Sequence, residues 1–304
     1  MSGMRTPRPR ATVAMAFLAF AAPVAPPAKL PDPATFHWAM ELPAAPWVAF
    51  RGVVNFDKAG IGPMNMMYPA PNPAGLLVAV LTHAAIAKGS REAQKTKIEK
   101  EADQVLEPFS GVINTFGYAD LAERSKPWAL TGTQLPVLPR GAPHPDTWVV
   151  LVNPVYSITQ DQTTLVLDNT IAIYAPGETK RTSYINTVRV IADAQVEPDP
   201  LAHWTADDGA QLKDRSAHLL AESLDIAFAD AMAPVTEAPF RTVRYQEGSE
   251  ERMERGQPIA EQCDRVLLRS LRGTLMSVPV KRLECAPAQG AQAAAAAAPA
   301  GGGG

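Results

Sequence analysis

The alternation of hydrophobic and polar residues is clearest between Thr147 and Ala192, which read TWVVLVNPVYSITQDQTTLVLDNTIAIYAPGETKRTSYINTVRVIA. Three runs rich in β-branched and aromatic residues, 148–158, 165–173 and 184–191, are separated by a polar loop and by the turn Pro176-Gly177-Glu178. Short loops between consecutive strands predict antiparallel neighbours. We therefore expect an α+β fold with a mostly antiparallel sheet, whose central meander spans about 147–192 and is covered by three or four helices.

In the second run four large hydrophobic residues share one parity, so one face of the sheet should be buried. The residues of that face are Leu165, Leu167, Ile171 and Ile173, and the wetter face carries Thr164, Asp168 and Thr170. Pro154 interrupts the first run, and because proline donates no backbone hydrogen bond, we expect a bend or an edge position there. Shorter strands are expected within 47–56 and 240–245.

One predicted helix is unusual because it is apolar almost all round. Asn72-Pro73 is a helix start, and the apolar residues run from Ala74 to Ala87. A helix that is apolar on every side is buried or sits in a membrane, and these fourteen residues are short for a bilayer span. The helix over 74–87 is therefore expected either to be buried in the core of the protein or to form a surface that contacts another protein. A polar helix is expected over 88–104 and a short one over 112–123.

Two amphipathic helices are predicted in the C-terminal half of the chain. The first begins at Asp207 or Asp208 and carries an apolar stripe at steps of three and four, from Leu212 to Ala231. The second follows Gly256-Gln257-Pro258 and runs from Ile259 to Met276. Its core face would consist of Ile259, Cys263, Val266, Leu267 and Leu271, and another face would carry Arg265, Arg269 and Arg272.

The two ends of the chain differ in composition from its middle. Arg5, Arg8 and Arg10 precede an apolar run of twelve residues, and Ala19-Phe20-Ala21 has small residues suited to cleavage, which is the layout of a secretory signal peptide. A disordered Ala/Pro-rich N-terminus is the alternative. We expect a signal peptide over 1–21, a Pro/Ala-rich lead-in over 22–35, a single α+β domain over 36–285 and a disordered Ala/Gly tail over 286–304.

Three groups of residues are candidates for interaction. Met64, Met66 and Met67 form either a soft contact surface or a loop folded back on the core. Val80 and Leu81 lie on the apolar helix and point about 100° apart. The three arginines of the last predicted helix either bind anionic lipid headgroups or form a solvated face paired with nearby acids. Partners of these groups would be a second copy of the chain, another envelope protein or the membrane surface.

The chain has two cysteines, Cys263 and Cys285. In an exported protein they could pair, and the bridge would close a short loop. The alternative is two free thiols, because Cys263 lies on the apolar face of the last predicted helix. We expect the disulfide.

Sequence patterns predict no catalytic, cofactor-binding or metal-binding residues. The five histidines are scattered, two cysteines cannot build a CxxC zinc cluster, and no P-loop, GxGxxG or GxSxG pattern occurs. The formal net charge of −3 provides no basic field for a nucleic acid. We expect no cofactor and no nucleic-acid partner, and the balance of these observations is against an enzyme.

Two segments of the chain resemble parts of uncharacterised exported bacterial proteins. They are MNMMYPAPNPAGLLVAVLTHAAIAKG and FRTVRYQEGSEERMERGQPIAEQCDRVLLRSLRGTLMSVP. The resemblance carries no activity and no catalytic residues, but it implies a bacterial cell envelope setting. This agrees with the signal peptide and indicates export to the periplasm or cell envelope.

Three functions are compatible with these patterns. The first is a non-catalytic envelope protein that binds a partner or associates with itself, as the apolar helix and the methionines before it indicate. The second is a periplasmic hydrolase, which would need a serine or carboxylate grouped with a histidine in a cleft. The third is a small-ligand carrier, which would need a closed apolar cavity with a few convergent polar groups.

Overall fold

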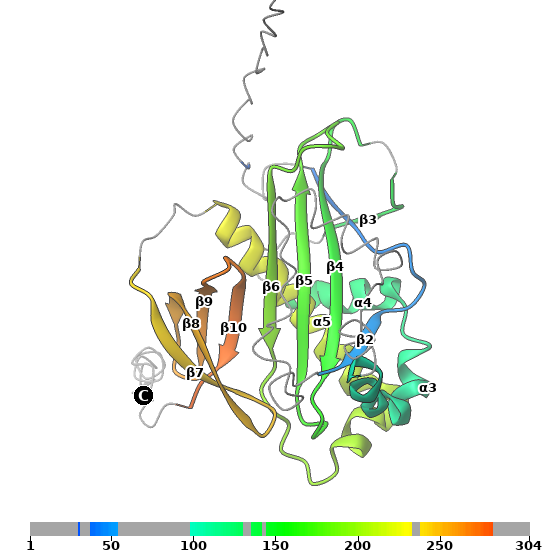
Figure 1. The fold of residues 1–304 in the computed structure, drawn as a ribbon. Helices are drawn as coiled ribbons and strands as arrows, with labels where there is room; N and C mark the ends of the chain where they lie inside the picture. The colour runs from blue at the N-terminus through cyan, green and yellow to red at the C-terminus, as the bar shows by residue number, and fades with distance from the viewer. Residues whose placement is uncertain are drawn as a thin grey trace, which may run out of the picture.

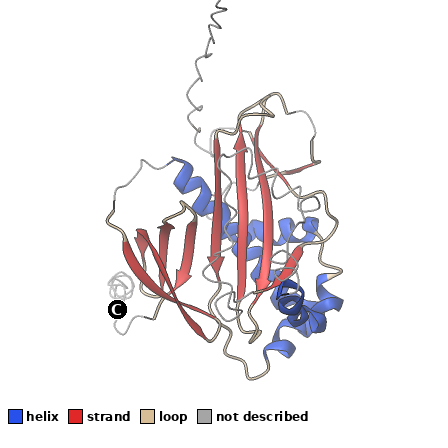
Figure 2. Cartoon of the chain, in the orientation of Figure 1, coloured by secondary structure: helices blue, strands red, loops and turns tan. Residues whose placement is uncertain are grey.

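The computed structural model describes residues 30, 37–53, 98–129, 135–141, 144–232 and 238–281. These residues form one ten-stranded sheet with helices packed against it (Figures 1 and 2). The predicted signal peptide, the apolar run 74–87, Met64, Met66, Met67, Val80, Leu81, Cys285 and the Ala/Gly tail all lie outside the described residues.

Two antiparallel meanders make up most of the sheet. The first contains β4 (Trp148–Ile158), β5 (Leu165–Tyr174) and β6 (Tyr184–Ile191). The second contains β7 (Arg241–Glu247), β8 (Glu250–Glu261), β9 (Arg265–Ser270) and β10 (Leu275–Pro279). Pairing between β6 and β10 is parallel and joins the two meanders into one sheet. The expectation of a mostly antiparallel α+β fold is confirmed at this level, and the strands expected within 148–158, 165–173, 184–191 and 240–245 are present.

Short N-terminal strands line the outer edge of the first meander. Strands β1 (Trp38–Glu41) and β2 (Ala49–Gly52) both pair in parallel with β4, and β3 (Val137–Leu138) pairs with β1. Strand β1 contacts 148–151 of β4 and β2 contacts 155–158, so Pro154 lies in the gap between them. The missing backbone donor of proline therefore costs no ladder hydrogen bond on that side, although β4 itself is an interior strand of the sheet and not an edge strand.

One long helix covers the inner face of the first meander. Helix α5 (Pro200–Met232) lies behind the central strands in the view of Figure 1 and contacts both β5 and β6. The predicted buried face of β5 packs in the same core cluster as Leu212, Leu219 and Leu220 of α5. The predicted apolar stripe of this helix is thus confirmed, and the parity of Leu165, Leu167, Ile171 and Ile173 identifies the side of β5 that meets the helix. The other face is less wet than predicted, because Thr164 is buried and Val166 packs in a second core cluster.

Helix α5 is broken once, at Ala206–Gly209. Asp207, Asp208 and Gly209 have φ values of 50°, 55° and 75°, in the left-handed region where glycine is favoured. A Cβ on Gly209 would lie 2.2 Å from a methyl carbon of Val112, so the close approach also requires glycine. The predicted start at Asp207 or Asp208 corresponds to this break, and the chain is helical before it as well as after it.

Shorter helices pack beside α5. Residues 98–103 are helical and continue into the 3-10 helix η2 (Gln104–Phe109), which includes Pro108. The predicted helix over 112–123 is two helices, α3 (Ser110–Ile113) and α4 (Tyr118–Ser125), separated by a turn. Helix α4 continues into η3 (Lys126–Trp128) and contacts α5.

The predicted helix from Ile259 to Met276 is wrong. This part of the chain consists of the end of β8, all of β9 and the start of β10. Along β9, buried Val266, Leu268 and Ser270 alternate with more exposed neighbours, which is the period of a strand. Residues four apart share a face in a strand as well as a helix, so the spacing of Arg265 and Arg269 could not separate the two structures.

The second meander has a small core of its own on the outer face of the sheet. Val243 and Tyr245 of β7 pack with Val266 and Leu268 of β9, and with Val166 and Ile191 from the first meander. The β7–β8 hairpin tip reaches the loop between β4 and β5, where the Ser249 amide donates to Asp161 Oδ2 at 2.6 Å. The two meanders are therefore held together by this cluster and this tip contact as well as by β6–β10 pairing.

Candidate functional site

The residues on either side of the 54–97 stretch meet at the end of β2. The side chain of Gln160 donates from the same nitrogen to the carbonyl oxygens of Val53, at 3.0 Å, and Ala102, at 3.2 Å. Gly52 donates its backbone N–H to Asp103 Oδ1 at 2.8 Å. We call these five residues the base of the 54–97 stretch. The chain before the stretch, at Val53, and the helix after it, at Ala102, therefore lie side by side at the edge of the sheet.

The close packing at the base depends on glycine. A Cβ added at position 52 would lie 1.9 Å from the carbonyl oxygen of Ala102, which is inside van der Waals contact. Gly52 is buried, and it is paired with Ile158 at the end of β4. Glycine is therefore required at position 52, where the helix over residues 98–103 packs against β2.

Gln160 is held in position by an ordered loop between β4 and β5. Asp161 Oδ1 accepts hydrogen bonds from the Thr159 hydroxyl at 2.6 Å, and from the Thr163 backbone and hydroxyl at 3.1 and 2.9 Å. Trp204 at the start of α5 donates its indole N–H to the carbonyl oxygen of Gln162 at 2.7 Å. The base is therefore supported from the sheet, from α5 and from the β7–β8 tip.

The charge of Asp161 is stabilised by these donors. Burial raises the pKa of its carboxyl, but hydrogen bonds from Thr159, Ser249 and Thr163 outweigh burial and lower the pKa to about 2. The carboxylate is ionised at neutral pH and joins two hairpins.

A charged cluster occupies the outer face of the first meander. Asp168 of β5 lies between two guanidinium groups, with Arg51 at 2.7 Å and Arg189 at 3.5 Å. Arg51 also donates to the Ser157 hydroxyl at 3.0 Å. The carboxylate of Asp168 raises the pKa of Arg189 despite burial, and Glu247 acts in the same direction. Both oxygens of Asp168 are engaged within the chain, so the cluster links β2, β4, β5 and β6.

One histidine lies near a carboxylate, as the hydrolase hypothesis requires. His144 Nε2 is 3.3 Å from Glu41 Oε1 at the end of β1. The two side chains are only 11% and 12% exposed, which leaves little room for a substrate beside them. The two groups are close, but His144 Nε2 makes no hydrogen bond with any described residue, and the pair lacks the open cleft that a hydrolase needs.

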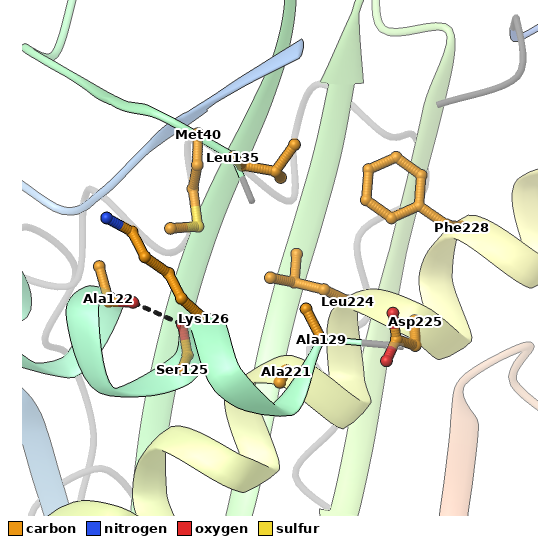
Figure 3. Close-up of a pocket in the computed structure, with 10 residues that line it drawn as sticks. All are labelled: Met40, Ala122, Ser125, Lys126, Ala129, Leu135, Ala221, Leu224, Asp225 and Phe228. Atoms are coloured by element: carbon orange, nitrogen blue, oxygen red, sulfur yellow. Dashed lines mark hydrogen bonds between the residues drawn. The ribbon is translucent and has the colours of Figure 1, made fainter. Parts of the chain in front are cut away.

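A small apolar cavity lies between α4, η3 and α5 (Figure 3). Its walls are formed by Met40, Ala122, Ser125, Lys126, Ala129, Leu135, Ala221, Leu224, Asp225 and Phe228. Its volume of about 30 Å³ holds one or two water molecules, whereas small-molecule sites occupy hundreds of cubic ångströms. This cavity does not suit the small-ligand carrier hypothesis.

The three arginines that were predicted to line one helix face lie on a strand and in the turn after it. Arg265 and Arg269 lie on β9 and bind acids of the chain, Arg265 with Asp193 and Arg269 with Asp230. Arg272 lies in the turn that follows β9. The three side chains therefore do not lie along one helix face, and their binding to anionic lipid stays a prediction.

Of the two cysteines, Cys263 lies within the described residues. Cys263 is exposed in the turn between β8 and β9 and forms no disulfide within the described part of the chain. It does not lie on an apolar helix face, so that argument for a free thiol is wrong. Because Cys285 lies outside the described residues, its pairing with Cys263 stays a prediction.

Sequence reasoning missed the base, the Asp168 cluster and the Glu41–His144 pair, because each joins residues that are far apart in the chain. Within the described ranges no group of three or more His, Cys, Asp or Glu side chains could hold a metal ion. None of the helices described is long and apolar enough to cross a bilayer. No family model, no curated protein and no solved structure matches the chain.

Proposed function

We propose that the chain is an exported component of the bacterial cell envelope that acts by binding and not by catalysis. It binds an envelope protein through residues 54–97 and associates with a second copy of itself. The observation that supports this most strongly is the base, where Gln160 bonds both Val53 and Ala102. Because Val53 before the stretch and Ala102 after it lie together, the stretch between them can present a binding element without interrupting the sheet.

The composition of the 54–97 stretch fits a binding element. It contains Met64, Met66 and Met67, and the apolar run from Ala74 to Ala87. Methionine adapts to irregular partner surfaces, and contiguous apolar residues on a soluble protein mark interaction sites. On the sheet, in contrast, charged side chains make contacts within the chain, such as Arg51 with Asp168 and Arg269 with Asp230.

Replacing residues 54–97 tests this proposal directly. Because Val53 lies beside the helix that contains Ala102, a flexible linker of about five residues, reaching ~16 Å, joins residue 53 to residue 98. We expect the shortened chain to fold with a cooperative denaturation transition like that of the full chain, and to lose its cross-links to other envelope proteins in cells. An unfolded product would mean that the stretch belongs to the core, and retained cross-links would place the binding site elsewhere.

Two point variants separate core from interface without shortening the chain. Val80→Asp and Leu81→Asp introduce a charge on two sides of the predicted helix. If the proposal holds, at least one variant keeps the stability of the full chain in urea denaturation and loses the cross-linked partner. Loss of folding in both variants would remove the main support for a binding helix.

Export is tested with the N-terminal residues alone. The arginines before the apolar run 11–22 are typical of a secretory signal. A fusion of residues 1–40 to alkaline phosphatase is expected to be active, because that enzyme needs the oxidising environment outside the cytoplasm to form its disulfides. A matched fusion with Leu18→Arg, which breaks the apolar run, should be inactive. An inactive wild-type fusion would contradict the proposed location.

A further inference from the structure

Strand β7 forms one end of the sheet order, and among the described residues it pairs only with β8 (Figure 1). Its pairing is regular over its full length, from Arg241 opposite Gly256 to Glu247 opposite Glu250. It contains neither proline nor a bulge, which are common ways to protect an edge. The backbone groups along its outer side are therefore in a geometry suited to pairing with another strand.

Side chains around this edge are exposed. Arg241, Thr242 and Arg244 of β7 are all exposed. Phe240, which precedes the strand, is 44% exposed, and Met253, which is opposite Arg244 on β8, is 61% exposed. By strand parity, Phe240, Arg244 and Met253 lie on one face of the sheet. The edge therefore combines a backbone that no other described strand pairs with, and apolar side chains that a partner strand would cover.

The sequence of β7 is complementary to itself when two copies run antiparallel. With Arg244 of one copy opposite Arg244 of the other, all seven residues, RTVRYQE, find a partner. Arg241, which also binds Glu261 of its own chain, then faces buried Glu247 twice, Thr242 faces Gln246 twice and Val243 faces Tyr245 twice. Opposite charges and aromatic with β-branched side chains are favourable cross-strand pairs. The central Arg244 pair is of like charge, but each Arg244 is already bound to Glu251 of its own β8 at 2.9 Å.

We infer that two copies of the chain associate through β7, antiparallel and about a twofold axis at Arg244, to form one continuous sheet. A row of Met253, Arg244, Arg244 and Met253 crosses the interface, and the arginine stems pack between the methionines. A twofold interface uses the same patch on both copies, as this strand allows. The inference rests on the self-association in the proposed function and assigns it to a surface separate from residues 54–97.

A charge exchange at the centre of the interface tests this assignment. The double variant Arg244→Glu, Glu251→Arg keeps the ion pair inside each chain and changes the central contact. Mixing it with the wild-type chain places the introduced carboxylate opposite Arg244 of the wild-type copy, while each homodimer keeps two like charges there. We expect the mixed dimer to form about three- to tenfold more tightly than either homodimer, as measured by native mass spectrometry of mass-labelled chains.

Controls make each outcome decisive. A wild-type chain that stays monomeric at about 100 μM, far above a typical micromolar dissociation constant, overturns the inference. A dimer whose mixed form appears only in the statistical proportion also overturns it, because the central pair would then not be in contact. The chain with residues 54–97 replaced should still dimerise. If it becomes monomeric while the full chain is dimeric, the dimer contact lies in that stretch and not on β7.

Discussion

Asp161 shows how one side chain can join parts of the fold that are distant in the chain. It accepts hydrogen bonds from Thr159 and Thr163 in its own loop and from Ser249 at the tip of the β7–β8 hairpin. Gly248 beside it has a φ of 64°, and a Cβ there would lie 2.7 Å from a carboxylate oxygen of Asp161. The contact between the hairpin tip and Asp161 is therefore as close as it is because residue 248 is glycine.

The contribution of Asp161 to stability should depend on pH. Its pKa of about 2 is below the ordinary value of 3.8, so its ionised form stabilises the folded chain. That stabilisation is complete above the unfolded pKa near 4 and is lost as pH falls towards about 2. Asp161→Asn should lower the free energy of unfolding by about 1 kcal/mol at pH 7, allowing for solvent screening.

Urea denaturation of both chains from pH 7 to pH 2.5 measures this effect. The difference between wild type and Asp161→Asn should be constant down to about pH 4.5 and shrink below it. Asp264→Asn, in an exposed turn between β8 and β9, is a suitable control. A difference that persists unchanged at pH 2.5 would show that charge on Asp161 is not what holds the two hairpins together.

Helix α5 is attached to the sheet by a polar contact at its C-terminal end. Asp230 accepts hydrogen bonds from the Tyr184 hydroxyl of β6, at 3.0 Å, and from the Arg269 guanidinium of β9. Burial raises the pKa of the Tyr184 hydroxyl, and the carboxylate of Asp230 raises it further. This contact connects one strand of each meander to the same helix.

Removing Asp230 should therefore be costly. Asp230 is only 10% exposed, and Asp230→Ala leaves Arg269 and Tyr184 without an acceptor, which we expect to cost about 2 kcal/mol in unfolding free energy. Asp214→Ala is the matched control, since Asp214 also lies on α5 and binds Arg124 but is 52% exposed. Its cost should stay below about 0.5 kcal/mol. Equal losses in urea denaturation would contradict the importance given to burial.

Individual helices and strands could be predicted from the sequence where the pattern that indicates them lies within a few neighbouring residues. The strands around Leu167 and Val188 were predictable because parity and turns lie within a few residues of each other. The prediction of a helix over residues 259–276 was wrong because a strand–turn–strand sequence can also place apolar residues at steps of three and four. The turn there contains Gly273, with a φ of 87°, and this glycine was the local signal against a helix.

Across the whole molecule, the sheet order was not predictable from local patterns. Parallel pairing of β1 and β2 with β4, and of β10 with β6, joins strands separated by long parts of the chain. The residues of the base have the same property, since Gln160 meets Val53 and Ala102 only after folding. Hydrophobic periodicity indicates which face of a strand is buried, but it does not indicate which strand lies next to it.

The parallel ladder between β6 and β10 also has a consequence for the time course of folding. The first meander needs only short loops, whereas β6 must wait for β10, which follows α5 and three further strands. Closing so long a loop is slow and costs entropy before contacts are gained. A chain that emerges from its N-terminus, at a ribosome or a translocation pore, therefore exposes the unpaired edge of β6 until its last strand arrives. That interval is when it is most vulnerable to aggregation and when a chaperone would be most useful.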